Sequence, residues 1–208
     1  MPKKSWDRYR SYGGRRINVR EPKQRFLIVC EGEKTEPYYF KGFRVPGDVV
    51  VDIHSGAGMH ISVVREAITR RDEAQDEYDQ VWCVFDRDKN RQNPHDSQQF
   101  NDALQLADTN NVRVAYTNDA FELWYFLHFN YHDTAIDRHD YATRLNALVS
   151  DGYRKNDPTI FSKLEERMDT ALRNAERLLS QYNPVNPERD DPSTTVHLLV
   201  TELQQYLN

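Results

Sequence analysis

The sequence of 208 residues lacks most features of secreted, disulfide-rich or membrane-spanning proteins. Only two cysteines occur, Cys30 and Cys83, and both stand in short apolar runs. This placement indicates buried, reduced thiols rather than a disulfide or a metal-binding pair. No apolar run approaches the roughly 18 residues of a membrane-spanning helix. The start, Met-Pro-Lys-Lys, lacks the apolar stretch of a signal peptide. We therefore expect a cytoplasmic protein without membrane association.

The first 25 residues are poor in acids, although the whole chain has a formal net charge of −5. They carry nine Lys or Arg side chains against two acids, and they include Arg15 and Arg16 beside the pair Gly13-Gly14. Such a basic arm suits a nucleic-acid phosphate backbone, and its aromatic side chains suit base stacking. A disordered, solubilising tail is the alternative. The acidic remainder does not exclude nucleic acid, because carboxylates that surround divalent cations also count as negative.

The rest of the chain first alternates β-type and helix-type segments. Expected strands cover residues 26–30, 49–53, 81–85 and 112–116, and expected helices begin near Thr35 and cover 61–73 and 96–107. This order predicts an α/β fold with a mainly parallel, four-stranded sheet flanked by helices on both faces. The runs 26–30 and 81–85 are almost entirely apolar, which is typical of central strands buried on both sides.

From about residue 119 the sequence changes character. Residues 121–129 are apolar and rich in aromatics, and helices are expected near 138–150, 162–181 and 193–207. We expect these helices to form an extension that packs on the sheet domain. The expected organisation is a basic arm at 1–25, an α/β core at 26–118 and a helical extension at 119–208.

Acidic side chains follow two of the expected strands at the point where each strand ends. Glu31 follows the run 26–30, and Asp86 and Asp88 follow the run 81–85. Residues two apart in an extended chain point to the same side, and ligands of open α/β folds bind beyond the carboxyl ends of the strands. Carboxylate oxygens favour Mg²⁺ or Mn²⁺. These three acids are therefore our candidates for metal binding and catalysis, although strand-end turn chemistry alone also explains a D-x-D pair.

Further charged residues close to these acids are secondary candidates. Glu33, Lys34 and Glu36 stand where a helix is expected to begin, and acids there are also stabilised by the helix dipole. Lys34 can pair with these acids or meet a phosphate. Lys89, in the polar loop after the third expected strand, can likewise offset phosphate charge.

Glu122 and His128 lie in the aromatic segment. A buried acid is costly unless it is paired or coordinated, so Glu122 either forms a salt bridge, for instance to Arg113 or Arg65, or joins the metal site. His128 is six residues further on and does not share a helix face with Glu122. We interpret His128 as a core or hydrogen-bonded histidine.

The placement of the three acids resembles the Toprim domain, which has a Glu after its first strand and a D-x-D after a later one. The resemblance implies a compact parallel sheet flanked by helices. It matches Glu31 to the Toprim glutamate, and Asp86 and Asp88 to the metal-binding aspartates.

A closer resemblance, over about residues 26–205, is to the RloB-like (AbiLii-like) family of bacterial phage-defence loci. It rests on Glu31-Gly-Glu-Lys-Thr-Glu-Pro-Tyr-Tyr-Phe40, Phe85-Asp-Arg-Asp88 and Asn118-Asp-Ala-Phe-Glu-Leu-Trp-Tyr-Phe-Leu-His-Phe129, with weaker matches at Tyr153-Arg-Lys155 and Pro192-Ser-Thr-Thr-Val196. The chain departs from the family pattern before Phe121, where Ser-Asn-Pro is usual. The resemblance implies a Toprim nuclease that acts with a partner ATPase of the ABC or SMC type, on DNA or RNA, with tRNA among the candidate targets.

We thus expect a Mg²⁺- or Mn²⁺-dependent nuclease in which water attacks the phosphodiester. Asp86 and Asp88 would hold the ion, and Glu31 would hold a second ion or accept a proton from the attacking water. Two alternatives stay open: a non-catalytic module that binds nucleic acid or the ATPase, and a Toprim nucleotidyl transferase. Whether the protein forms a homodimer also stays open.

Overall fold

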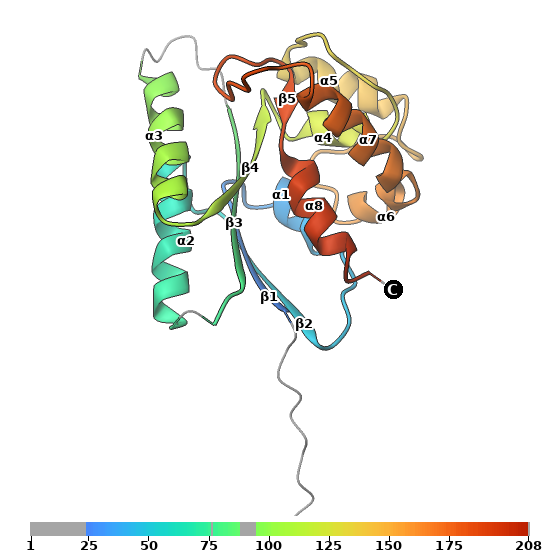
Figure 1. Cartoon of the computed structure of the whole chain (residues 1–208). Coiled ribbons are helices and arrows are strands. Elements are labelled where there is room, and N and C mark those ends of the chain that lie inside the picture. Colours follow the sequence, from blue (N-terminus) through green and yellow to red (C-terminus); the bar gives the residue numbers. More distant parts are fainter. Residues whose placement is uncertain (1–23, 76, 88–94, 208) are drawn as a thin grey trace, which may run out of the picture.

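A five-stranded sheet forms the centre of the protein in a computed structural model that describes residues 24–75, 77–87 and 95–207 (Figure 1). The strands follow the order β2-β1-β3-β4-β5 across the sheet. They are β1 (Gln24–Cys30), β2 (Val49–His54), β3 (Gln80–Asp86), β4 (Arg113–Asn118) and β5 (Ser193–Thr194). The first four are parallel and β5 is antiparallel to β4.

The prediction of a mixed α/β fold with a mainly parallel sheet is confirmed, but the sheet has five strands rather than four. The added strand, β5, is only two residues long and pairs Thr194 with Thr117 and Ser193 with Asn118. Two polar residues show no alternation of apolar and polar side chains, so the sequence carries no local signal for this strand. This strand forms because residues 193–194 pair with the backbone groups at the edge of β4.

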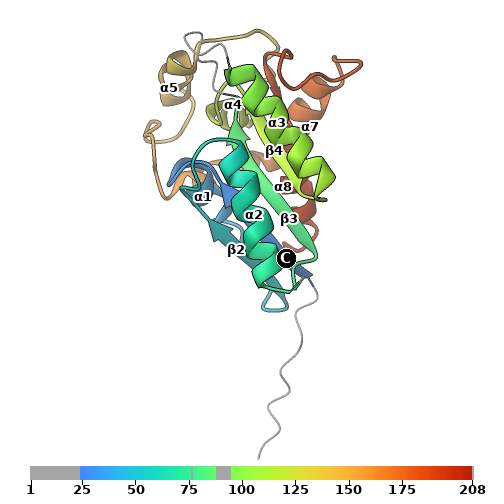
Figure 2. The ribbon, with the colours of Figure 1, turned by 90° about the vertical axis from the view of Figure 1, so that its left-hand side faces the viewer.

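Helices cover both faces of the sheet. α2 (Ile61–Glu73) and α3 (Asp96–Thr109) lie on one face, and the remaining helices lie on the other (Figures 1 and 2). β1 shows how one strand serves both cores: Leu27 and Val29 pack towards α2 and α3, whereas Phe26, Ile28 and Cys30 pack into the opposite core. Alternate side chains of a strand point to opposite faces, which explains why β1 is apolar throughout.

The helices on the second face are short. They are α1 (Thr35–Phe40), α4 (Glu122–Leu127), α5 (Arg138–Asn146), α6 (Ile160–Leu164), α7 (Met168–Leu179) and α8 (Val196–Gln204). The single helix expected at 162–181 is wrong, because a 3₁₀ turn at Glu165–Arg167 divides it into α6 and α7. Buried positions continue at helical spacing through this turn, from Leu164 to Met168 and Ala171, so the periodicity hides the break.

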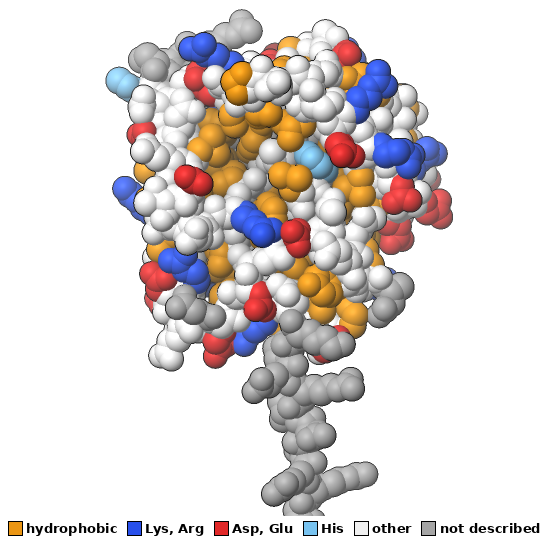
Figure 3. Space-filling view, in the orientation of Figure 1, with side chains coloured by type: hydrophobic (Ala, Val, Ile, Leu, Met, Phe, Trp, Pro, Cys, Tyr) orange, Lys and Arg blue, Asp and Glu red, His pale blue; other side chains and the backbone are white. Residues whose placement is uncertain are grey.

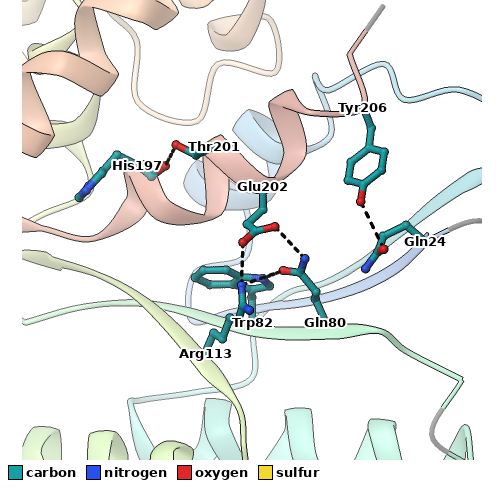
Figure 4. A network of polar contacts seen from close by, with 8 residues as sticks. All are labelled: Gln24, Gln80, Trp82, Arg113, His197, Thr201, Glu202 and Tyr206. Atoms are coloured by element: carbon teal, nitrogen blue, oxygen red, sulfur yellow. Dashed lines mark hydrogen bonds and ion pairs between the residues drawn. The ribbon is translucent and has the colours of Figure 1, made fainter.

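A polar network fastens α8 to the sheet (Figure 4). Glu202 accepts hydrogen bonds from Arg113 and from the side-chain amide of Gln80, both at 2.9 Å. The Trp82 indole nitrogen donates to Gln80 Oε1 at 2.9 Å, and Arg113 lies over the indole ring. The network joins β3, β4 and the C-terminal helix.

An apolar groove lies open between α3 and α8. Hydrophobic side chains gather along it on the face seen in Figure 3. Its cavity of about 850 Å³ is lined by residues that include Leu104, Val112 and Leu198. None of the helices in the described part of the chain is long and apolar enough to cross a membrane.

Candidate functional site

Five carboxylates line one cavity of about 390 Å³, those of Glu31, Glu33, Glu36, Asp86 and Glu122. Glu31 follows the last residue of β1, Asp86 ends β3, Glu36 lies in α1, and Glu122 begins α4. Neighbouring parallel strands end at the same edge of the sheet, and the register pairs Cys30 with Val84. The fold therefore carries these acids to the carboxyl edge, where open α/β proteins bind ligands.

Glu31 and Asp86 are directly connected. The backbone N–H of Asp86 donates to Glu31 Oε2 at 3.2 Å, and the backbone N–H of Glu31 donates to the Val84 carbonyl at 2.9 Å. Asp86 Oδ2 accepts a hydrogen bond from the Phe121 amide at 3.1 Å. The structure thus brings together two of the three acids predicted from the sequence. The third, Asp88, lies outside the described residues, as do Lys89, Arg15 and Arg16.

Glu36 lies deeper in the site than its position at the start of a helix suggests. The residue is 5% exposed, and its Oε2 is buried without a hydrogen-bond partner in the described structure. A Cβ atom on Gly32 would stand 2.4 Å from this oxygen. Gly32 therefore makes room for the Glu36 carboxylate at the cavity wall, so the structure places Glu36 inside the cavity. Glu33 and Lys34 are exposed at its mouth.

The carboxylates disfavour one another's ionisation. Burial raises the pKa of Asp86 well above its ordinary value, and the charges of Glu36, Glu122 and Glu31 raise it further. Burial also raises the pKa of Glu36. Backbone hydrogen bonds at Glu36 and Gly32 oppose that rise, as does the charge of Lys155, while Glu122 adds to it. Negative charge collected in a buried site is stabilised by a cation.

Glu122 is buried and hydrogen-bonded. The Tyr153 hydroxyl donates to Glu122 Oε1 at 3.0 Å. The salt bridges suggested for Glu122 are wrong for the described structure: Arg113 pairs with Glu202, and Arg65 lies in a groove between α2 and α3 on the opposite face of the sheet. Of the two roles considered for Glu122, its position favours membership of the carboxylate site.

Three cations line the same cavity, namely Lys34, Arg138 and Lys155. Arg138 begins α5, and the sequence gives no sign that this helix reaches the site. Lys155 belongs to the Tyr153-Arg-Lys155 motif, whose position in the fold only the structure reveals. Both residues come from the part of the chain after the parallel strands.

Two histidines have structural roles. His128 is fully buried, with Nδ1 2.9 Å from the Trp124 carbonyl, so the prediction of a core histidine is confirmed. His60 Nε2 lies 2.9 Å from the backbone carbonyl of Asp86 and must carry the proton of that hydrogen bond, because a carbonyl can only accept. His60 therefore holds the end of β3.

The described residues contain no group of three or more His, Cys, Asp or Glu side chains placed so that it could hold a metal ion. The fit to a divalent cation rests on two buried oxygens, Asp86 Oδ1 and Glu36 Oε2, which have no hydrogen-bond partner in the described structure. Buried polar atoms normally have partners, and carboxylate oxygens are the ligands of Mg²⁺ and Mn²⁺. The chemistry of these two oxygens, taken by itself, suits a hard divalent ion.

Comparison with known proteins gives one match. A family model described as RloB-like protein matches residues 26–203. No curated protein and no solved structure matches the chain. The matched range includes all five carboxylates and the cationic residues of the cavity. The chain therefore belongs to the family of RloB-like proteins.

Proposed function

We propose that the protein is a metal-dependent nuclease that hydrolyses phosphodiester bonds of DNA or RNA. The observation that carries this proposal is the pair of buried carboxylate oxygens without hydrogen-bond partners, Asp86 Oδ1 and Glu36 Oε2, in a cavity with cations at its rim. An acidic floor suits a divalent ion, and basic side chains around it suit a phosphate. The Toprim-like arrangement inferred from the sequence agrees with this chemistry.

The ion would be held by Asp86 and Glu36, with Asp88 as a further ligand expected from the sequence, and Glu31 would hold a second ion or accept a proton from the attacking water. When bound, Mg²⁺ or Mn²⁺ polarises the phosphoryl oxygen and stabilises the leaving oxyanion. The chain itself contributes the rest. Hydrogen bonds from Phe121 and from the Asp86 amide orient the Asp86 and Glu31 carboxylates. Burial raises the pKa of Glu36, and a bound cation would favour its charged form as a ligand.

Water is a better nucleophile for this site than the nearby tyrosine. Among the described residues, Tyr153 is the tyrosine whose hydroxyl contacts a site carboxylate, and it donates a hydrogen bond to Glu122. Burial and the Glu122 charge raise the pKa of Tyr153, so the phenol stays protonated and weakly nucleophilic. We therefore propose hydrolysis rather than formation of a covalent tyrosyl intermediate.

The test is cleavage by the purified protein of plasmid, single-stranded DNA and bulk tRNA, with Mn²⁺ or with EDTA. We expect cleavage with Mn²⁺, none with EDTA, and a loss on the order of 10²-fold or more for Asp86→Asn and Glu31→Gln. Glu73→Gln is the matched control, because Glu73 is an exposed acid on the opposite face of the sheet. Cleavage that survives in EDTA or in Asp86→Asn would overturn the proposal.

The proposed setting is anti-phage defence with a partner ATPase of the ABC or SMC type, as the family resemblance implies. The cleavage assay is therefore repeated with a candidate ATPase of this type added. Binding of nucleic acid or of the ATPase without cleavage in either assay would favour a non-catalytic module. Incorporation of nucleoside triphosphates into a strand would favour nucleotidyl transfer.

A further inference from the structure

A second cavity adjoins the carboxylate site. Its volume is about 520 Å³, and it shares Lys155 and Asn156 with the first cavity. The remaining lining residues all come from the segment 151–163. A ligand that fills the carboxylate site can therefore continue past Lys155 into a second space formed by one segment of the chain.

This segment is fixed on both sides of Lys155. Before it, the Tyr153 hydroxyl is bonded to Glu122. After it, the Asn156 side-chain oxygen accepts a hydrogen bond from Thr35 at 3.1 Å. Glu122 and Thr35 belong to α4 and α1, which also line the carboxylate cavity. The position of Lys155 is thus coupled to the walls of the site.

The charge changes sign from one cavity to the next. Asp157 is paired with Lys163 at 2.9 Å and accepts further hydrogen bonds from Thr159. These bonds lower its pKa to about 2 despite the opposing effect of burial, so Asp157 is a satisfied, paired carboxylate. The exposed charges that remain are Arg154 and Lys155 against Asp151. The first cavity suits a metal ion, and the second suits an anion.

We propose that residues 151–159 form a subsite for the substrate strand, in which Lys155 and Arg154 bind a phosphate next to the one that is cleaved. The proposal rests on the proposed function and deepens it. A single nucleotide needs only the first cavity, whereas a polynucleotide places phosphates at regular intervals and can fill both. The structure thus favours a polynucleotide substrate over a mononucleotide.

The first test is equilibrium binding of fluorescent single-stranded DNA and RNA in EDTA, measured by anisotropy across a range of salt concentrations. Arg154→Gln and Lys155→Gln should each weaken binding several-fold and reduce the salt slope, by about 0.7 for each lost phosphate contact. Arg65→Gln, an exposed cation on the opposite face, should bind as the wild type does. Thermal melting checks that each variant is folded. The DNA and RNA strands show which nucleic acid the subsite prefers.

The second test compares two substrates of the Mn²⁺-loaded protein. Bis(p-nitrophenyl) phosphate has one phosphodiester and no neighbouring phosphate, so Arg154→Gln should lower kcat/KM for an oligonucleotide more than for this small diester. Wild-type binding by Arg154→Gln and Lys155→Gln at every salt concentration would overturn the subsite. That result would leave the nuclease proposal standing if Asp86→Asn still abolished cleavage. Weaker binding by both variants without any cleavage would instead support the subsite and reject the nuclease.

Discussion

The backbone amide of Asp86 donates a hydrogen bond to the carboxylate of Glu31, so the last residue of one central strand directly supports the first residue after its neighbour. The Glu31 carboxylate thus supplies a negative charge to the site and also holds the end of β3 in place. Replacement of Glu31 by Gln keeps an oxygen that can accept the bond, whereas Ala removes it. Glu31→Gln therefore tests the charge of the side chain with little effect on the strand end.

Gly32→Ala should reduce activity with little loss of stability. The added Cβ would meet the Glu36 carboxylate at 2.4 Å, and the end of a flexible side chain can move away. We expect a melting temperature close to that of the wild type, together with weaker Mn²⁺ binding and slower cleavage.

A double variant tests the cause of the Gly32→Ala effect. Glu36→Asp shortens the acid and removes the clash, so the effects of Gly32→Ala and Glu36→Asp on kcat/KM should not be additive. Additive losses would mean that Gly32 acts through something other than Glu36. Gly47→Ala is the control for a general effect of Gly-to-Ala replacement, because a Cβ there meets no atom within 4 Å.

Tyr153→Phe should destabilise the protein without abolishing cleavage. It removes the donor to the buried Glu122 carboxylate, which should cost about 1–3 kcal/mol in urea unfolding. Cleavage should persist, because the proposed nucleophile is water. Complete loss of cleavage in a folded Tyr153→Phe protein would instead indicate a tyrosine nucleophile.

The parallel strands could be predicted because their residues carry a strong local signal. Four runs of mostly apolar residues alternate with amphipathic segments, and the acids Glu31 and Asp86 stand where two of these runs end. Strand order and direction then bring both acids to one edge. The first half of the site thus follows from local sequence and the topology rules of α/β folds.

The second half of the site depends on contacts between distant parts of the chain. Glu122, Arg138 and Lys155 reach the cavity because α4, α5 and the segment after them pack on the edge of the sheet. No spacing in the sequence encodes that packing. The strand β5 escapes prediction for the same reason, because Ser193 and Thr194 become a strand only beside Asn118 and Thr117.

Mn²⁺ should raise the thermal stability of the wild type at neutral pH. An ion that binds only the folded state at about 100 times its Kd contributes about 2.7 kcal/mol, which corresponds to a rise in Tm on the order of 5–10 °C. Asp86→Asn and Glu36→Gln should lose most of this rise, whereas Glu73→Gln should keep it. An equal Mn²⁺ shift in all four proteins would place the ion elsewhere.

In EDTA the Glu36→Gln protein should melt at a higher temperature than the wild type, because the variant lacks a buried carboxylate that disfavours the ionisation of its neighbours.

Two buried histidines should make the protein sensitive to acid. Burial lowers the pKa of His128 and of His197 from 6.5 to about 4. Between these values the unfolded chain holds a proton on each imidazole that the folded protein does not, so the free energy of unfolding falls as the pH falls. The expected loss is about 1.4 kcal/mol per pH unit for each histidine.

The buried carboxylates act in the opposite direction, since their raised pKa values favour proton uptake by the folded state. The contribution of one histidine is therefore the difference between wild type and His128→Gln in urea unfolding from pH 4.5 to 6.5. His128→Gln should lose less stability than the wild type over this range. His139→Gln is the control, because His139 is exposed, and it should follow the wild type. Identical pH slopes for the wild type and His128→Gln would show that the fold does not hold His128 neutral.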